Sequence, residues 1–459
     1  MAQKPSIPKG TRDFTPSEIA KRNYIFDTIK RNFQTYGFQP IETPSFENSE
    51  TLLGKYGEEG DRLIFKILNS GDFISKVDDK TYSDKNSNSI APKITEKALR
   101  YDLTVPFARY VVMHQNELDF PFKRYQIQPV WRADRPQKGR FREFFQCDAD
   151  VVGSDSLLQE VELIQLYDGV FSDLKLEGAT IKMNNRKILA GIAEVIGAKH
   201  LLIDFTVALD KLDKIGEEGV KKEMLAKGIS EKAIEKAAPL FEPQGSNVDQ
   251  LNRLDNLLKD SEEGQKGLEE LRFIMETIST LGLQSAKLAI DVTLARGLNY
   301  YTGAIFEVSA PEGVSMGSIG GGGRYDDLTG IFGLKDVSGV GISFGLDRIY
   351  LVLEELNLFP EAVDKSLDVL CLNFGIKEAL ASLKLVTELR KRGIMSDLYP
   401  SDVKIQKQFK YANNRMVPYV ILLGAEELEN NSFVVKYMES GDQITYALSE
   451  VDKFVSTLN

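Results

Sequence analysis

The stretch with the most potential for chemistry is segment 125–153, where polar side chains alternate with apolar ones on both sides of a basic loop. Side chains two positions apart share one face of a β-strand, and Pro136 and Gly139 are typical of a turn. The sequence therefore predicts an antiparallel hairpin with one polar face. That face would carry Gln126, Gln128, Arg132, Arg142, Gln146, Asp148 and Asp150. A guanidinium, amides and carboxylates on a common surface suit the binding of an anion beside a small polar molecule.

The loop of this hairpin is basic although the protein is acidic. Positions 123–143 contain seven basic and two acidic residues, whereas the whole chain has a net charge of −11. A solvated basic hairpin is the simplest interpretation of such a composition. The order of residues favours another. WRADRPQKGR followed by FREFFQCDAD closely resembles motif 2 of class II aminoacyl-tRNA synthetases, in the form found in the histidyl-tRNA synthetase family.

Length and composition exclude several classes of protein. A chain of 459 residues is expected to form about three domains. The two cysteines are too few for a disulfide framework or a thiolate metal site, and the two histidines are expected to be structural. No apolar run is long enough to span a membrane, and the first residues lack the apolar core of a signal peptide, so we expect a cytoplasmic protein without membrane contact. The acidic balance means that an RNA partner would have to bind at local basic patches.

The first elements of the chain are expected to be a long helix and an extended segment. Ser17 is a candidate N-cap for an amphipathic helix that runs through Tyr36, and Gly37 would end it. Residues 38–46 contain two prolines, which favour extended backbone. A long helix followed by a proline-bearing strand resembles motif 1, which forms the homodimer contact of class II synthetases.

Two features lie between this segment and the hairpin. Residues 75–89 are rich in Lys, Asp and Ser and predict a mobile loop. Residues 98–110 alternate in polarity and predict a strand, with Asp102 and Thr104 on one face. An edge strand with outward polar residues is one interpretation. The other comes from the resemblance, because histidyl enzymes hold the α-amino group of their substrate at the motif that reads ALRYDLTVP here.

The second half of the chain begins with a helical block. From about residue 186 to residue 285 the composition shifts to Lys, Glu and Leu, and apolar residues recur at helical spacing, which predicts core helices. In the family, a helical insertion at this place leans over the acceptor arm of the tRNA. The next segment, RGLNYYTG, is nearly diagnostic of the family, with Arg296 in a loop and Tyr300 and Tyr301 entering a strand.

Two glycine-rich segments follow, and each resembles a nucleotide-binding loop of another protein class. The run 320–323 lacks the Gly-Lys-Ser/Thr ending of a Walker phosphate loop. GVGISFG at 339–345 mimics a dinucleotide fingerprint, but no strand–helix–strand unit surrounds it. GISFGLDRIY instead resembles motif 3, a strand that runs into a helix carrying an ATP-binding arginine, here Arg348.

The last hundred residues predict a separate domain. After a linker at 357–365, strand, helix and strand patterns at 367–372, 377–392 and 419–423 predict a small α/β domain with a parallel sheet. A basic group, which an ordinary solvated face would also explain, lies on the connecting helix and at its end: Lys404, Lys407, Lys410 and Arg415. The family places its anticodon-binding domain here.

The resemblance covers nearly the whole chain and implies an α+β fold, with an antiparallel sheet flanked by helices. It implies a catalytic domain in two parts, 1–186 and 286–357, a helical insertion at 187–285 and an anticodon-binding α/β domain at 366–459. The implied reaction joins L-histidine and ATP into histidyl-adenylate, releases pyrophosphate and passes histidine to the 3′ end of tRNA(His). Magnesium and a homodimer are also implied, although the sequence does not identify the protein ligands of the metal.

Site residues follow from the matching motifs. Arg132 and Arg296 are expected at the α-phosphate, where fixed cations would stabilise charge that builds in the transition state. Arg348 would bind ATP through the outer phosphates and adenine, and Arg135 and Gln137 in the hairpin loop would face the tRNA acceptor end. The histidine site would be formed by Asp102, Leu103, Thr104, Arg132, Gln146, Asp150, Arg296, Tyr300 and Tyr301. Within it, Asp102, Thr104 and Gln146 would anchor the α-amino group, and Asp150 and Tyr301 the imidazole.

Two alternatives remain open. One is a non-catalytic, synthetase-like regulatory subunit of histidine biosynthesis. Such subunits usually lack the anticodon domain and parts of RGLNYYTG, whereas this chain has both. The other is a class II synthetase for a different amino acid, which should not carry RGLNYYTG.

Overall fold

The computed structural model describes residues 4–241, 245–295, 300–364 and 366–458. The chain divides into two compact units, Met1–Phe359 and Pro360–Asn459. Each unit has a sheet and a hydrophobic core of its own. The site residues expected from motifs 2 and 3 all lie in the first unit.

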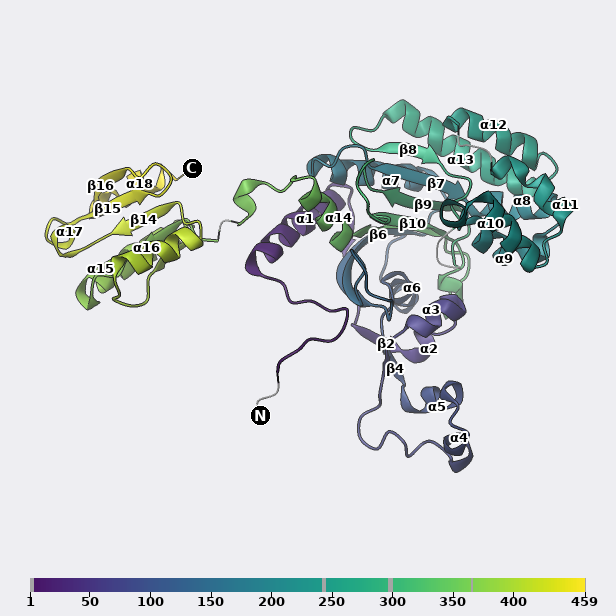
Figure 1. The fold of residues 1–459 in the computed structure, drawn as a ribbon, viewed down its shortest axis with the longest axis horizontal. Coiled ribbons are helices and arrows are strands. Elements are labelled where there is room, and N and C mark those ends of the chain that lie inside the picture. The colour runs from purple at the N-terminus through teal and green to yellow at the C-terminus, as the bar shows by residue number, and fades with distance from the viewer. Residues whose placement is uncertain (1–3, 242–244, 296–299, 365, 459) are drawn as a thin grey trace. The chain divides into compact units, whose positions relative to one another are not determined.

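An eight-stranded sheet organises the first unit (Figure 1). It is antiparallel except at its two edges, where the outermost strands pair in parallel with their neighbours. The expected antiparallel sheet is thus confirmed. In order across the sheet the strands are β1 (Gln39–Pro40), β5 (Phe122–Trp131), β6 (Glu143–Val152), β11 (Gly339–Gly345), β10 (Gly320–Tyr325), β9 (Ala304–Ser309), β7 (Thr180–Asn185) and β8 (Lys287–Ile290).

Three helices, α1 (Pro16–Thr35), α7 (Leu158–Asp173) and α14 (Leu346–Glu355), pack together against the sheet. The predicted first helix is confirmed, but its N-cap is Thr15 rather than Ser17. Thr15 and Glu18 form a reciprocal capping box, and a proline follows at the first helical position, where its missing N–H costs nothing. Ile25, Ile29 and Phe33 recur at helical spacing and are fully buried, so this stripe fastens α1 to the core.

The block predicted to be helical is helical in the structure. Its last helix packs on α7, on α8 and on β7, which places the block at the β7–β8 edge of the large sheet (Figure 1). Its elements are α8 (Arg186–Val195), the 3-10 turn η1 (Lys199–Leu201), α9 (Leu202–Leu209), α10 (Leu212–Ala226), α11 (Glu231–Lys236), η2 (Ala238–Leu240), α12 (Asn247–Leu258) and α13 (Glu262–Leu281).

A second, three-stranded sheet lies before the hairpin in the chain, in the order β2 (Phe46–Asn48), β4 (Lys97–Leu99) and β3 (Lys66–Ile67). The loop predicted at 75–89 is wrong in part, because two short helices form there, α4 (Asp79–Ser83) and α5 (Ser87–Ile94). The side chains of Asp78 and Asn86 cap the two helices by accepting hydrogen bonds from backbone N–H groups. Because polar residues surround both positions in the sequence, the two N-caps were not recognised there. The remaining elements of this region are α2 (Ser49–Leu52), α3 (Gly57–Leu63), α6 (Thr104–Met113) and, further along the chain, η3 (Thr329–Phe332).

The second unit contains a five-stranded sheet in the order β13 (Ser396–Leu398), β12 (Val369–Cys371), β14 (Tyr419–Leu422), β15 (Ser432–Tyr437) and β16 (Gln443–Ala447). The two predicted strands, β12 and β14, pair in parallel as expected, and β13, which was not predicted, pairs in parallel with β12. The prediction of a wholly parallel sheet is wrong, because β15 and β16 add an antiparallel hairpin. The helical elements are η4 (Glu361–Asp364), α15 (Ile376–Lys391), α16 (Ile405–Asn414), α17 (Ala425–Glu429), η5 (Leu448–Glu450) and α18 (Val451–Val455).

Candidate active site

Strands β5 and β6 form the hairpin that the sequence predicts, and its register places the polar side chains in pairs. Gln128 lies opposite Gln146, Gln126 opposite Asp148, and Arg124 opposite Asp150. Because side chains on directly opposed residues leave the sheet on the same face, these six polar groups share one surface. The next strand, β11, continues the surface on the other side of β6.

Asp150 is held at the deep end of this surface by two partners. Tyr325 Oη of β10 donates a hydrogen bond to Asp150 Oδ1 at 2.5 Å. Arg124 Nη2 lies 2.9 Å from Asp150 Oδ2 in an ion pair whose two side chains are almost completely buried. Burial raises the pKa of Asp150, and the neighbouring guanidinium opposes that rise. The carboxylate is therefore fixed in position as well as hidden from water.

Asp102 stands on a different kind of element from the one expected. Residues 98–110 were predicted to be one strand, but β4 ends at Leu99 and helix α6 begins at Thr104. Pro106 does not prevent this helix, since the N–H groups of a first turn have no partner within the helix. The strand prediction is therefore wrong.

The carboxylate of Asp102 nevertheless reaches the site. Tyr56 Oη donates to Asp102 Oδ1 at 2.7 Å, and Tyr300 Oη donates to Asp102 Oδ2 at 3.1 Å. The N–H of Val105, in the first turn of α6, donates to Oδ1 at 3.2 Å. Burial raises the pKa of Asp102, while these hydrogen bonds favour its charged form.

Arg132 and Gln146 are joined at the mouth of the site. Arg132 Nε donates to the carbonyl of Tyr101 at 2.9 Å, and Arg132 Nη2 donates to Gln146 Oε1 at 3.3 Å. The Tyr101 ring lies 4.3 Å below the guanidinium carbon. Gln146 in turn donates to the hydroxyl of Ser343 on β11 at 3.2 Å. These contacts fix the orientation of the guanidinium before any ligand arrives.

A small cavity of about 40 Å³ lies between these groups. It is lined by Asp102, Thr104, Gln146, Asp148, Asp150, Tyr300, Tyr301, Gly321, Gly322, Tyr325, Gly341, Ile342 and Ser343. Six residues predicted from the sequence thus meet at one cavity. Leu103 does not line it. Its side chain is buried, and its carbonyl lies 3.4 Å from Arg124 Nη2, which donates to it.

A larger cavity of about 300 Å³ adjoins the small one, since Gln146, Tyr301, Gly321, Gly322 and Ser343 line both. Arg132 and Arg348 also line the larger cavity. Arg348 Nε donates to the carbonyl of Gly139 in the hairpin loop at 3.1 Å, and its Nη1 donates to the carbonyl of Ser318 at 2.5 Å. Burial lowers the pKa of Arg348, and the charge of Arg140 adds to the effect. With Arg140, three guanidinium groups lie in the wall of this cavity, which suits an anionic ligand.

Two strand positions beside the small cavity have room for glycine only. The run at 320–323 is part of β10, the strand between β9 and β11. It is therefore not a Walker phosphate loop, in agreement with the sequence analysis. A Cβ on Gly322 would lie 2.1 Å from the carbonyl oxygen of Gly341, and a Cβ on Gly341 would lie 2.0 Å from Asp150 Oδ1. Side chains at these positions would therefore displace the backbone or the buried carboxylate.

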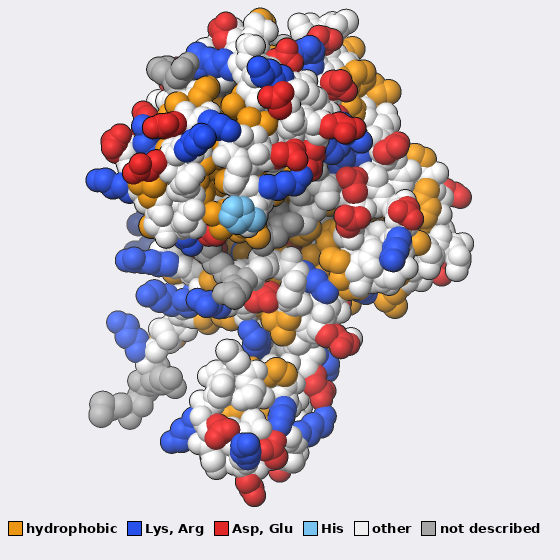
Figure 2. Space-filling view, turned by 90° about the vertical axis from the view of Figure 1, so that its right-hand side faces the viewer, with side chains coloured by type: hydrophobic (Ala, Val, Ile, Leu, Met, Phe, Trp, Pro, Cys, Tyr) orange, Lys and Arg blue, Asp and Glu red, His pale blue; other side chains and the backbone are white. Residues whose placement is uncertain are grey.

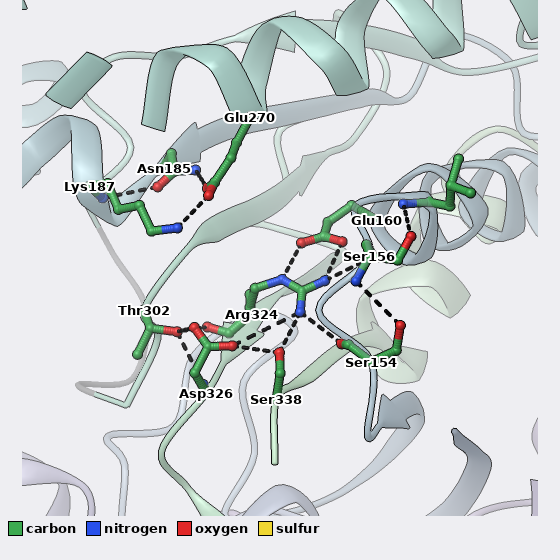
Figure 3. A network of polar contacts seen from close by, with 11 residues as sticks. Ser154, Ser156, Glu160, Asn185, Lys187, Glu270, Thr302, Arg324, Asp326 and Ser338 are labelled. Atoms are coloured by element: carbon green, nitrogen blue, oxygen red, sulfur yellow. Dashed lines mark hydrogen bonds and ion pairs between the residues drawn. The ribbon is translucent and has the colours of Figure 1, made fainter. Parts of the chain in front are cut away.

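A buried polar network holds the segment around Tyr325 in place (Figure 3). Arg324 forms two hydrogen bonds of 2.6 Å with Glu160 of α7, and its Nη1 donates to Ser338 Oγ at 2.6 Å. The hydroxyls of Ser338 and Thr302 each donate to Asp326 at 2.5 Å. Since Thr302 follows Tyr301 directly and Arg324 precedes Tyr325, this network ties two of the three tyrosines of the small cavity, Tyr301 and Tyr325, to α7.

The remaining predicted residues either lie at the edge of the site or are not among the residues that the structure describes. Arg135 and Gln137 are exposed in the hairpin loop, which is closed by backbone hydrogen bonds between Gln137 and Arg140. Arg296 belongs to 296–299 and lies outside the described residues. Tyr300 and Tyr301 precede β9, which begins only at Ala304, so the expectation that they enter the strand is wrong.

Within the described parts of the chain, no group of three or more His, Cys, Asp or Glu is placed to hold a metal ion. No helix among those residues is long and apolar enough to cross a membrane.

Comparison with known proteins identifies the family. The family model for histidyl-tRNA synthetase matches residues 93–349, and the model for the anticodon-binding domain matches residues 368–458. The histidine–tRNA ligase of Christiangramia forsetii is 68% identical over 443 residues, which cover 96% of this chain and 97% of the relative. The chain belongs to the histidyl-tRNA synthetase family.

Further relatives agree along the whole length of this synthetase. The histidine–tRNA ligase of Flavobacterium johnsoniae is 65% identical over 463 residues, covering 97% of this chain and 98% of the relative. A solved histidyl-tRNA synthetase from Nostoc sp. PCC 7120 superposes with a TM-score of 0.81 at 30% identity, covering 99% of this chain and all of that one. These matches support a synthetase rather than the regulatory subunit considered above.

Sequence reasoning missed several residues of this synthetase site. Arg124 has the same strand parity as Gln126, so alternation could have placed it beside Asp150. Tyr325 is the last residue of β10 and lies on the same strand face as Gly321 and Gly323, so alternation along this strand could also have pointed to it. Tyr56 carries none, since only the tertiary fold brings it to Asp102.

Proposed function

We propose that the small cavity holds L-histidine and the larger one ATP. The enzyme activates histidine as histidyl-adenylate, releases pyrophosphate and transfers histidine to the 3′ end of tRNA(His). The observation that carries the proposal is the adjoining arrangement of the cavities. A carboxyl-lined cavity the size of a small side chain opens into an arginine-lined one, with Gln146 and Tyr301 in the walls of both.

Arg132 and Arg296 are the proposed catalytic groups. During activation the carboxylate of histidine attacks the α-phosphorus, and negative charge grows on the phosphate oxygens as pyrophosphate leaves. A cation already fixed at that place stabilises the transition state more than the ground state. The support for Arg132 is its anchoring to Tyr101 and Gln146 at the junction of the cavities. Arg296 rests on the family motif alone.

Arg348 is the proposed ATP-binding residue. Its guanidinium is planar and carries several donors, so it can both stack on adenine and bind phosphate oxygens. Its hydrogen bonds to Gly139 and Ser318 hold it in the wall of the larger cavity. A guanidinium held in this wall suits a polyanion.

Asp102, Thr104 and Gln146 form the proposed site for the α-amino group of histidine. An ammonium group needs acceptors, and Asp102 offers a buried carboxylate whose position is set by Tyr56 and Tyr300. Leu103 would act indirectly, because its carbonyl accepts a hydrogen bond from Arg124, the partner of Asp150. Asp150 and Tyr301 are the proposed contacts of the imidazole ring, because both line the small cavity.

Magnesium is the proposed metal. Mg²⁺ is usually bound by one or two carboxylates together with substrate phosphates. Three acidic residues line the larger cavity, and Asp347 is already paired with Arg12 and Arg22 at 2.6 Å each. The other two are Asp134, which lies 3.4 Å from Arg140, and Glu307, and the ion would be held by one or two of these three carboxylates together with the ATP phosphates. When bound, the ion would neutralise phosphate charge.

Residues 1–186 and 286–357 are proposed to form the catalytic domain, 187–285 a helical insertion and 366–459 an anticodon-binding domain. Arg135 and Gln137 would contact the acceptor end of the tRNA. On the face seen in Figure 2, basic and acidic side chains are interspersed, so RNA would be bound by local patches.

The protein is further proposed to be cytoplasmic, with no membrane contact, and to form a homodimer through residues 38–46. In that segment Gln39, Pro40 and Phe46 are exposed. Sedimentation should show a dimer, and a monomer that is fully active at nanomolar concentration would contradict this assignment.

One assay tests the function. ATP–pyrophosphate exchange is measured with each of the twenty amino acids in turn, and charging of tRNA(His) transcripts is then measured with the amino acid that supports exchange. Exchange with histidine alone, followed by charging, is expected. A regulatory subunit would give no exchange with any amino acid, and a synthetase of another specificity would respond to a different one.

A further inference from the structure

The small cavity contains one carboxyl more than the proposed function assigns. Asp102, Asp148 and Asp150 all line it, and none of these three residues is more than 2% exposed to solvent. Among the described residues that line the cavity there is no Lys or Arg. The nearest buried cation is Arg124, which is paired with Asp150. Asp148 has no role in the mechanism above.

Of the three carboxyls, Asp148 also has the weakest hydrogen bonds and no ion pair among the contacts of the described residues. Asp102 accepts three hydrogen bonds and Asp150 has a short hydrogen bond and an ion pair, whereas Gln146 Nε2 lies 3.4 Å from Asp148 Oδ1, at the long end of hydrogen-bond distances. Ser343, opposite it on β11, is its other partner. Burial raises the pKa of Asp148 to about 7; Arg124 opposes this rise, and the charges of Asp150 and Asp102 increase it.

The groups facing Asp148 come from every neighbouring element. Strand β5 contributes Arg124 and the neutral Gln126, and β6 contributes Gln146 and Asp150. Strand β11 contributes Ser343, and β10 contributes Tyr325. The segments outside the sheet contribute Asp102, Tyr300 and Tyr301. Together with Asp148 itself, this set contains three carboxyls and one buried cation, Arg124.

A charge count then follows for the occupied pocket, and it rests on the proposed function. With all three carboxyls ionised and Arg124 positive, the protein contributes −2. The ammonium group of histidine brings +1 and its carboxylate −1, and Arg132, which is hydrogen-bonded to Gln146 at the mouth of the site, balances that carboxylate. One uncompensated buried negative charge is left if the imidazole is neutral. An unpaired buried charge is costly, and a titratable group in such a place takes up a proton instead.

We propose that the pocket binds histidine together with one proton, which Asp148 and the imidazole ring share. The ring then approaches the imidazolium form between two carboxylates, Asp148 and Asp150. Tyr301 fits this state, because a phenol oxygen can accept from a ring N–H as well as donate to a ring nitrogen. Asp148 is accordingly a specificity-determining residue that selects a basic ring.

The sign of the coupling depends on pH. Free imidazole has a pKa near 6.5. At pH 6 both free partners are largely protonated, so forming a complex with one shared proton releases about 0.7 proton. At pH 8 both free partners are largely deprotonated, so the complex takes up about 0.9 proton from the buffer. Histidine Kd should therefore rise about sevenfold between pH 7.5 and pH 8.5.

Isothermal titration of the intact protein with L-histidine, in two buffers of different ionisation enthalpy, measures this proton directly. Uptake near one at pH 8 that changes to release at pH 6 is expected for the native chain. Asp148→Asn should take up almost no proton when it binds histidine at pH 8, because without Asp148 the occupied pocket has no net charge when the imidazole is neutral. At pH 6 the variant should still release the proton that the imidazole of free histidine carries. Asp119→Asn, which removes an exposed carboxyl, is the matched control and should behave as the native protein does.

The outcomes separate the two proposals. Histidine binding without proton uptake at pH 8 in the native protein overturns the shared proton and leaves the proposed function intact; this measurement needs no variant that must fold. Unchanged uptake in Asp148→Asn overturns the assignment to Asp148. Absence of histidine binding at every pH overturns the proposed function and this inference together.

Discussion

Gly341→Ala probes the wall of the proposed imidazole site without touching a proposed contact. Gly341 lies on β11 directly opposite Asp150 of β6. An added Cβ would lie 2.0 Å from Asp150 Oδ1 and 2.4 Å from its Cγ, far inside van der Waals contact. The carboxylate must move, and its hydrogen bond from Tyr325 at 2.5 Å and its ion pair with Arg124 at 2.9 Å cannot both survive.

The expected loss follows from these contacts. A hydrogen bond to a charged group contributes about 1.5–3 kcal/mol. If the displaced carboxylate loses one such contact to the bound ring, kcat/KM for histidine falls roughly 10- to 150-fold. The KM for ATP should stay within about twofold, since Gly341 lines the small cavity only.

Pyrophosphate exchange at varied histidine and varied ATP measures both effects, with circular dichroism to confirm folding. Gly330→Ala is the matched control, because a methyl group added there meets nothing within 4 Å. A folded Gly341→Ala enzyme with native kcat/KM for histidine would refute the reasoning, as would equal losses for histidine and ATP.

Three further changes test other parts of the site. Asp150→Asn should weaken histidine use by at least about 1.5–3 kcal/mol in exchange assays with ATP KM nearly unchanged, and an intact kcat/KM for histidine would move the imidazole contact to another acid. Arg296→Ala should lower kcat for adenylation by roughly 10²–10³ in rapid-quench measurements, and near-normal adenylate formation would remove it from the mechanism. The double variant of Arg135→Ala and Gln137→Ala should slow acyl transfer more than adenylation, and equal losses in the two steps would assign the loop to ATP.

The hairpin was predictable because strand alternation depends on the backbone alone. Side chains two residues apart share a face whatever the strand packs against, so Gln146, Asp148 and Asp150 could be placed together from the sequence. The same holds for β11 and α14, where a strand ending in glycine runs into the helix that carries Arg348.

The segment that carries Asp102 was mispredicted because a short pattern fits two periods. Asp102 and Thr104 alternate with apolar neighbours, as in a strand, yet Val105, Ala108 and Val111 also recur at helical spacing and are buried in α6. Tertiary packing selected the helix. The hydroxyl of Tyr56, 46 residues earlier in the chain, reaches Asp102 only through that packing, so no local pattern could reveal it.

The central claim is that buried polar groups, rather than the shape of the pocket, select histidine. The most direct test is the ratio of kcat/KM in pyrophosphate exchange for histidine and for 2-thienylalanine, whose ring has similar size but no nitrogen. A site that leaves a buried carboxylate and a hydroxyl unpaired rejects such an analogue by about 10⁴–10⁵. A ratio in that range is expected. A ratio below about 10² is what shape alone supplies, and it would contradict the account.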